Sequence, residues 1–185
     1  LLTSSSVIDA LKHLSLQANP PHLLLSGPAG CGKTTALQLV CRQVLGPSWR
    51  ATTHVLQARD LDKTAGAMAK FEAFLRPEGA GSEDTLAGRT SLDAFDHNIS
   101  ASADASPPPA GEESIAPAVG TLAAVSRIII IEDADYLGHA RQSYLRRMME
   151  ESSRSARFLF TTHTPSRIIE ALRSRTQHVR MPSLT

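Results

Sequence analysis

Residues 22–40 read HLLLSGPAGCGKTTALQLV, and the succession of segments in this stretch decides the fold. HLLLSG (22–27) is a short apolar run, which favours a buried strand. KTTALQLVCRQVL (33–45) carries apolar residues at helical spacing and is followed by Gly-Pro, so it predicts a helix. Between them, GPAGCGKT (27–34) matches the pattern G-x-x-x-x-G-K-[ST] in the position that this pattern requires, after a strand and at the start of a helix.

This glycine-rich turn predicts a site for ATP. Its glycines let the backbone turn its N–H groups inward, and with the N-terminus of the next helix they form a cradle for phosphate oxygens. Lys33 would reach the β- and γ-phosphates, and the Thr34 hydroxyl would ligate Mg²⁺. The residues expected to bind the nucleotide are Gly27, Pro28, Ala29, Gly30, Cys31, Gly32, Lys33, Thr34 and Thr35. The alternative is a chance glycine-rich turn, and the flanking strand and helix argue against it.

A second signal is IIIIEDAD (128–135), in which four isoleucines run into the carboxylates of Glu132, Asp133 and Asp135. The unbroken β-branched run predicts a strand that is buried on both faces. An ATPase of this kind needs a carboxylate-bearing strand beside the first one, to hold Mg²⁺ through its water shell. Glu132 and Asp133 are therefore candidate site residues. The alternative is an acidic turn that caps the next helix, a role that Asp135 could share.

The rest of the pattern alternates strands and helices, which indicates a parallel sheet covered by helices on both faces. The expected helices, besides that at 33–45, are 4–14, 63–75, 140–151 and 166–175, and the further expected strands are 54–58, 127–131, 157–162 and 177–181.

Composition bounds the class of protein. The chain has 185 residues, 42% of them hydrophobic, which suffices for one domain with an aliphatic core. It has no run of ~18 apolar residues, so no membrane association is expected. Cys31 and Cys41 are isolated, which argues against a disulfide scaffold or zinc and favours a reducing, intracellular environment. The chain starts at Leu1, so we expect the true N-terminus to lie upstream.

Two segments stand out by their composition. Residues 76–126 are rich in Ala, Ser, Gly and Pro, which predicts a disordered low-complexity insertion. Residues 139–180 hold nine arginines against three glutamates. That excess is compatible with a polyanionic partner, and an ordinary solvated surface is the alternative.

Taken together, these motifs resemble the AAA+ ATPases of the clamp-loader group, and most closely the small subunits of eukaryotic replication factor C. That family has a strand ending in D-E-A-D, a helix with A-L-R-R-x-M-E, a strand starting R-F with an Asn at its tip, and S-R/K-I-I-x-x-L-x-S-R-C. The corresponding segments here are EDAD (132–135), YLRRMMEE (144–151), RFLFTTH (157–163) and SRIIEALRSRT (166–176), with a weaker match at VLQARDLD (55–62). The resemblance spans 22–75 and 127–185.

The resemblance implies a P-loop AAA+ fold with strand order 5-1-4-3-2 and one nucleotide-binding domain over 1–185, with the family's lid and collar outside this chain. It implies a nuclear ATP-binding subunit of a hetero-oligomeric, pentameric clamp loader that acts in DNA replication and repair. Its partners would be the other clamp-loader subunits, a PCNA-type sliding clamp and primer–template DNA.

The resemblance also implies roles for single residues. Arg175 matches the arginine of S-R-C, which in the family reaches the ATP of the neighbouring subunit; the alternative is an arginine that neutralises a helix C-terminus. His163 falls at the sensor position, where Asn is usual. Gln142 matches a family glutamine, and Arg146 and Arg147 match its double arginine, with an exposed helix face as the alternative.

This chain departs from the family where the chemistry is expected. The order Asp-Glu is reversed to Glu132-Asp133, so the longer side chain lies at the metal and the shorter one at the attacking water. Asp133 would fall short of that water by one methylene, about 1.3–1.5 Å, and a misplacement of about 1 Å can cost on the order of 10²-fold in rate. A different register would put Asp133 on the metal and leave no base, because Ala134 follows. Thr176 replaces the motif's Cys.

Three interpretations therefore stay open. The first is a replication factor C small subunit that binds and hydrolyses ATP to load the clamp. The second is a structural subunit that binds nucleotide with weak or no hydrolysis and lends Arg175 to the next site. The third is another AAA+ protein of DNA replication, such as a bacterial clamp-loader subunit or a helicase loader.

Overall fold

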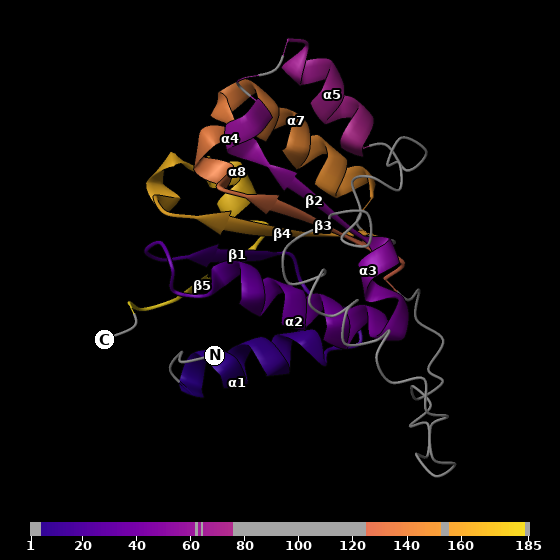
Figure 1. Cartoon of the computed structure of the whole chain (residues 1–185), viewed down its shortest axis with the longest axis vertical. Coiled ribbons are helices and arrows are strands. Elements are labelled where there is room, and N and C mark those ends of the chain that lie inside the picture. The colour runs from indigo at the N-terminus through magenta and orange to yellow at the C-terminus, as the bar shows by residue number, and fades with distance from the viewer. Residues whose placement is uncertain (1–4, 62, 64, 76–124, 153–155, 184–185) are drawn as a thin grey trace, which may run out of the picture.

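The computed structural model describes residues 5–61, 63, 65–75, 125–152 and 156–183, which form a five-stranded parallel sheet with helices on both faces (Figure 1). The strands are β1 (Leu23–Ser26), β2 (Thr53–Gln57), β3 (Arg127–Glu132), β4 (Ala156–Thr162) and β5 (Gln177–Arg180). Their order is β2-β3-β4-β1-β5, with all neighbours parallel. The predicted α/β class and the order 5-1-4-3-2, counted from the opposite edge, are confirmed.

The two faces of the sheet are covered by helices from different parts of the chain. One face carries α1 (Ser5–Ser15), α2 (Lys33–Leu45), η1 (Gly46–Ser48) and α3 (Trp49–Thr52), and the other carries α4 (Ala58–Leu61), α5 (Ala67–Leu75), η3 (Ala134–Tyr136), α7 (Gly138–Glu151), η4 (Pro165–Arg167) and α8 (Glu170–Arg173). In the part of the chain that the structure describes, no helix is both long and apolar enough to span a membrane.

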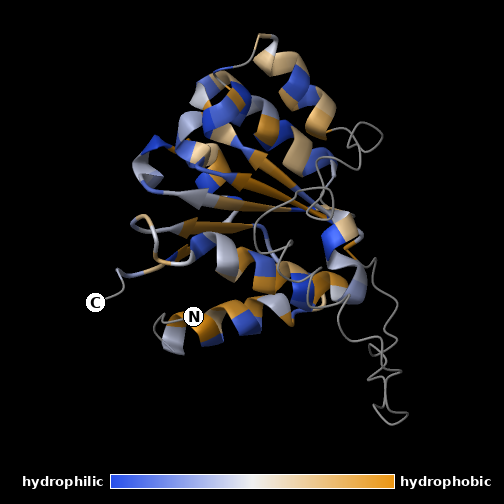
Figure 2. Cartoon of the chain, viewed as in Figure 1, coloured by the Kyte–Doolittle hydropathy of each residue, from blue (hydrophilic) through white to orange (hydrophobic). Residues whose placement is uncertain are grey.

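The isoleucine run explains this two-sided burial. Ile128 and Ile130 pack into the core under α1 and α2, whereas Ile129 and Ile131 pack into the core under α5 and α7. All four are 1% exposed or less. Hydrophobic colour accordingly runs along the strands, while the helices are mixed (Figure 2). Because neither face meets water, the alternation of a half-exposed strand is absent from the sequence.

Several predicted boundaries are wrong. The single helix predicted at 166–175 is two short turns, η4 and α8, separated by extended backbone at Ile168 and Ile169. Two adjacent β-branched residues disfavour a helix, and Ile168 is drawn into the core, where it is 4% exposed. The helix predicted at 63–75 begins at Ala67, after Gly66 with φ 73°. The insertion predicted at 76–126 lies, except for its last two residues, outside the described part of the chain.

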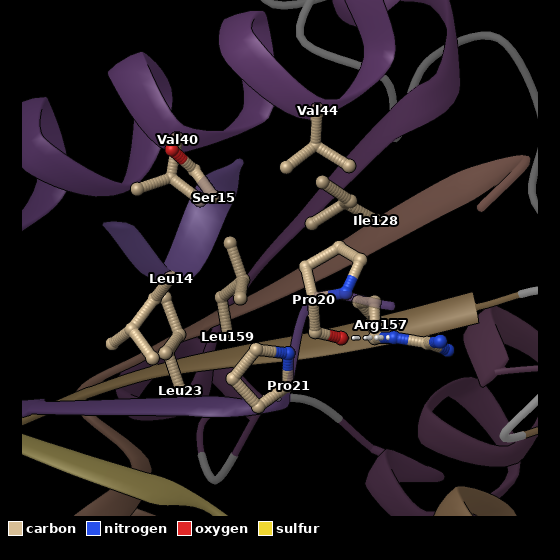
Figure 3. Close-up of a pocket in the computed structure, with 10 residues that line it drawn as sticks. All are labelled: Leu14, Ser15, Pro20, Pro21, Leu23, Val40, Val44, Ile128, Arg157 and Leu159. Carbon is tan, nitrogen blue, oxygen red and sulfur yellow. Dashed lines mark hydrogen bonds between the residues drawn. The ribbon is translucent and has the colours of Figure 1, made fainter. Parts of the chain in front are cut away.

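The segment between α1 and β1 is held against the start of β4 by a buried arginine. Arg157 is 5% exposed and donates a hydrogen bond to the Pro20 carbonyl (Figure 3). It also donates to the Asn19 side chain. The adjacent cavity of about 10 Å³ has room for about one water molecule. Next to Arg157, His22 Nδ1 accepts a hydrogen bond of 3.0 Å from the Phe158 N–H. Burial, and then the charge of Arg157, lower the pKa of His22 to about 4.

His22 should make the fold sensitive to mild acid. Its pKa is lowered in the folded state, so its contribution to stability is complete above the unfolded pKa near 6.5 and is lost as pH falls towards 4. The free energy of unfolding, measured by denaturant titration, should fall by up to about 3 kcal/mol from this residue. His22→Asn keeps an acceptor but cannot titrate, so its profile should be flatter. His13→Asn, on the exposed side of α1, is the control, and equal profiles for the two variants would contradict the assignment.

Candidate functional site

The strand ends that carry the predicted site residues meet at one edge of the sheet. In a parallel sheet the carboxyl ends of all strands lie at the same edge, where open α/β sheets bind ligands. There the loop from β1 to α2 faces the ends of β2, β3 and β4 across a pocket of about 380 Å³. The pocket is lined by Ala29, Gly30, Gly32, Lys33, Thr34, Thr35, Gln57, Glu132, Asp133, Thr161 and His163.

The glycine-rich loop presents positive charge and helix amides to this pocket. Gly30 and Gly32 have φ of 77° and 86°, the left-handed region that glycine enters at little cost. No described side chain caps α2 at Gly32, so the first N–H groups of the helix are directed to the pocket without a side-chain acceptor. Lys33 is 8% exposed, and its Nζ donates to the carbonyls of Gly27 (2.8 Å) and Pro28 (2.7 Å). These neutral partners hold the ammonium group over the loop without neutralising it.

Three residues predicted to bind the nucleotide do not line the pocket but shape the loop. A Cβ on Gly27 would lie 2.4 Å from the Met181 carbonyl oxygen, just after β5. Only glycine therefore fits at position 27 without a shift of the backbone. Cys31 is 2% exposed and packs in the core beneath the loop. Pro28 is exposed and contributes its carbonyl to Lys33.

Glu132 and Gln57 form a pair on the floor of the pocket. They are register partners on β3 and β2, and Gln57 Nε2 donates a hydrogen bond to Glu132 Oε2. Glu132 is 7% exposed, and the structure gives it no cationic partner among the described residues. The carboxylate is thus buried and hydrogen-bonded by a neutral amide, and it lines the same pocket as Lys33 and Thr34.

Asp133 has the opposite surroundings. Its Oδ2 lies 2.6 Å from Arg59 Nε, and its Oδ1 lies 3.2 Å from His163 Nε2. Its backbone N–H donates to Thr161 Oγ1 (3.0 Å), and its φ of 54° is left-handed, a conformation that aspartate adopts more readily than most residues. Both carboxylate oxygens therefore already have partners, and the Arg59 guanidinium also stacks on the Tyr136 ring at 4.5 Å.

The third carboxylate, Asp135, joins two strands and does not cap a helix. Its Oδ1 accepts hydrogen bonds from the Thr162 hydroxyl (2.9 Å) and, more weakly, from the His163 N–H (3.4 Å). Within the described residues, no side chain caps η3 or α7. The alternative in which the acidic stretch is a helix cap is therefore wrong, because these carboxylates bond across the sheet edge.

The remaining predicted residues lie away from the pocket. Arg175 Nη2 lies 2.6 Å from Glu150 Oε1, and its Nη1 donates to the Ala171 carbonyl (2.9 Å). Gln142 is 2% exposed and bridges the broken segment, since it donates to the Arg167 carbonyl and accepts from the Ile169 N–H. Gln142 thus satisfies the backbone groups that are left unpaired between η4 and α8. Arg146 and Arg147 are exposed on α7, each in an ion pair four residues along the helix.

Sequence reasoning missed three residues of the site: Gln57, Arg59 and Thr161. Gln57 and Thr161 lie at the carboxyl ends of predicted strands, and the rule that these ends share one edge would have found them. Arg59 follows in α4, a turn that the sequence did not predict.

Comparison with known proteins identifies the family. Residues 5–161 match the family described as AAA ATPase domain. The chain belongs to this family. Its resemblance to replication factor C small subunits is confirmed by matches to those of Natronomonas pharaonis (29% identity over 92% of this chain) and Archaeoglobus fulgidus (30% over 91%), and to replication factor C subunit 4 of Oryza sativa subsp. japonica (28% over 98%). The chain spans about two fifths of the length of these relatives, 39–42%.

Solved structures of other AAA proteins share the fold. A RuvB variant from Thermotoga maritima superposes with a TM-score of 0.53 at 15% identity, over 97% of this chain and 43% of its own. A katanin structure gives a TM-score of 0.51 at 20% identity, over 98% of this chain and 51% of its own. At these identities the likeness extends to the fold alone.

The loop glycines should differ in their tolerance of a side chain. Gly27→Ala forces a methyl group against the Met181 backbone, so the free energy of unfolding should fall by about 1–3 kcal/mol. A Cβ on Gly30 would meet no described atom within 4 Å, and the φ there is 77°, so Gly30→Ala should cost only the left-handed strain of about 1–2 kcal/mol. Denaturant unfolding of both variants measures the difference. A Gly27→Ala protein as stable as the wild type would contradict the steric conflict between position 27 and the Met181 carbonyl.

Proposed function

We propose that this chain is the ATP-binding domain of a clamp-loader subunit of the replication factor C kind. The observation that carries the proposal is one pocket in which the uncapped N-terminus of α2 and Lys33 face the buried carboxylate of Glu132. A cradle of positive charge opposite a carboxylate fits a polyphosphate that carries a divalent cation. The AAA domain and the relatives named above support the same function.

The donor set fits Mg²⁺ bound together with ATP. The described residues contain no group of three or more His, Cys, Asp and Glu able to hold a metal ion. Mg²⁺ keeps several waters and is usually bound by one or two carboxylates together with phosphate oxygens. Thr34 and Glu132 would hold the ion here, while Lys33 and the amides of α2 bind the phosphates. The bound ion would neutralise charge that develops on the phosphates during hydrolysis.

A second function, nucleotide binding with weak or no hydrolysis, is favoured by the contacts of Asp133. A carboxylate has about four acceptor sites, and Arg59 and His163 take one on each oxygen of Asp133, so they restrict how this carboxylate can orient a water. The shorter side chain at this position adds to the effect. In this form of the proposal, Arg59 and His163 hold Asp133 in place and it does not act as a base. The subunit then binds nucleotide without hydrolysing it and has a structural role in its complex.

The wider context of the proposal comes from the relatives. The chain would work in a hetero-oligomeric, pentameric complex in the nucleus, with a PCNA-type sliding clamp and primer–template DNA as partners, in DNA replication and repair. Residues 1–185 would be its nucleotide-binding domain, with a lid and collar supplied by further chain. The arginine-rich face of α7 would approach DNA phosphates, and a salt dependence of affinity near zero would contradict that contact.

ATP turnover by the assembled complex tests both forms of the proposal. Lys33→Ala should abolish nucleotide binding in either form, and retained binding would contradict the site itself. If Asp133 acts as a base, Asp133→Ala should lower DNA-stimulated turnover at this site by about 10²-fold or more, whereas unchanged turnover supports the structural subunit. Arg59→Ala is the matched variant, because freeing Asp133 should raise turnover only where Asp133 can serve as a base.

Arg175 should act on the neighbouring site and not on its own. It does not line the pocket of this chain, so Arg175→Ala should leave nucleotide affinity at Lys33 unchanged. In the complex, turnover at the adjacent site should fall by about 10³-fold, the smaller of the effects known for such arginines. Arg173→Ala, an exposed neighbour paired with Glu170, is the control. Loss of affinity in the chain's own pocket would contradict action on a neighbour.

A further inference from the structure

The neutral partner of Glu132 is not explained by the proposed function. Gln57 and Glu132 lie opposite each other on neighbouring strands, so their side chains leave the sheet on the same face. Gln57 Nε2 donates to Glu132 Oε2, and both residues line the pocket with Thr34. One oxygen of the carboxylate is therefore fixed to β2.

The other two carboxylates at this strand end are satisfied in a different way. Asp133 is paired with the cation of Arg59 and with His163, and Asp135 accepts from a hydroxyl and a backbone N–H. Neither Glu132 (7% exposed) nor Asp135 (9% exposed) has a cation among the described residues, but only Glu132 lines the pocket, and the one hydrogen bond that the structure gives it comes from an amide. A buried carboxylate without a cation is costly. Its surroundings therefore suit an ion that arrives with a ligand.

Because the Glu132 side chain is long, its conformation needs to be restricted, and Gln57 is placed to do this. Glutamate has one rotatable bond more than the aspartate that is usual at this position, so an unrestrained Glu132 would distribute its carboxylate over more positions. An amide on the neighbouring strand removes that freedom by holding Oε2, and it leaves Oε1 available. The amide donates without adding charge, so it orients the carboxylate and leaves its affinity for a cation intact.

We propose that Gln57 is a positioning residue for Mg²⁺, which fixes the Glu132 carboxylate towards the water shell of the ion bound with ATP. This inference rests on the proposed function, because the ion is the one that accompanies the nucleotide. Groups that orient a metal-binding carboxylate typically change metal affinity by 10–100-fold when removed. The effect of Gln57 should therefore be seen in metal-dependent binding, in addition to the loss of stability expected when a buried carboxylate loses its hydrogen bond.

The test compares nucleotide affinity with and without the metal. The full chain is titrated with a fluorescent ATP analogue, first in EDTA and then at saturating Mg²⁺, and the ratio of the two dissociation constants gives the gain due to Mg²⁺. Gln57→Met keeps the length of the side chain but cannot donate. We expect it to lower this gain about 10-fold while affinity in EDTA stays at the wild-type value; the unfolding midpoint should fall, because the buried carboxylate loses its donor. Gln43→Met, on the exposed face of α2, is the matched control and should change neither.

A double-mutant cycle removes the remaining ambiguity. In a Glu132→Gln background the carboxylate is absent, so Gln57→Met should have no further effect on the Mg²⁺ gain. An unchanged gain in Gln57→Met, an equal loss of affinity in EDTA, or a full effect in the Glu132→Gln background would each overturn the inference while leaving the ATP site in place. A wild-type chain that binds no analogue, or gains nothing from Mg²⁺, would overturn the proposed function together with this inference.

Discussion

The parallel register of the sheet is the constraint on which the site depends. Ser26 lies opposite Thr162, and Glu132 lies opposite Gln57, so the polar ends of four strands reach one level. The apolar residues before them are buried on both faces, so a shift of register would place these polar side chains among the apolar side chains of the core. The charged residues of β3, Arg127 and Glu132, stand at its two ends, because the four isoleucines between them are buried.

The three carboxylates at this edge differ in the groups that they bind. Asp133 and Asp135 are bound to groups of the protein itself, and they join β3 to α4 and to β4. Among the described residues Glu132 receives only an amide, and it lines the same pocket as Lys33. A buried network is stable when each member is satisfied. Glu132 and Asp135 both lack a cation among these residues, and only Glu132 lines the pocket, so an external cation is expected beside Glu132.

Most of the fold and most of the pocket could be predicted from the sequence, for physical reasons that differ by element. The glycine-rich turn and the isoleucine run are local patterns whose geometry depends little on the rest of the chain, so Lys33, Thr34 and Glu132 were found directly. The break at Ile168 could not be found locally, because it depends on burial of that side chain and on two hydrogen bonds from Gln142. Gln57 and Arg59 belong to a weakly matching segment, and only strand pairing places them beside the carboxylates.

The reversed order of Glu132 and Asp133 has a consistent physical account in these contacts. An aspartate next to Arg59 and His163 is short enough to be held by both, and its left-handed backbone turns it away from the strand. A glutamate one position earlier is long enough to project from the strand, and the amide of Gln57 limits the freedom that this length brings. Under the function proposed above, the exchange would keep a carboxylate for the metal and would restrain the one that could activate water. If the proposed function holds, this geometry would allow nucleotide binding and turnover to be separated at the same strand end.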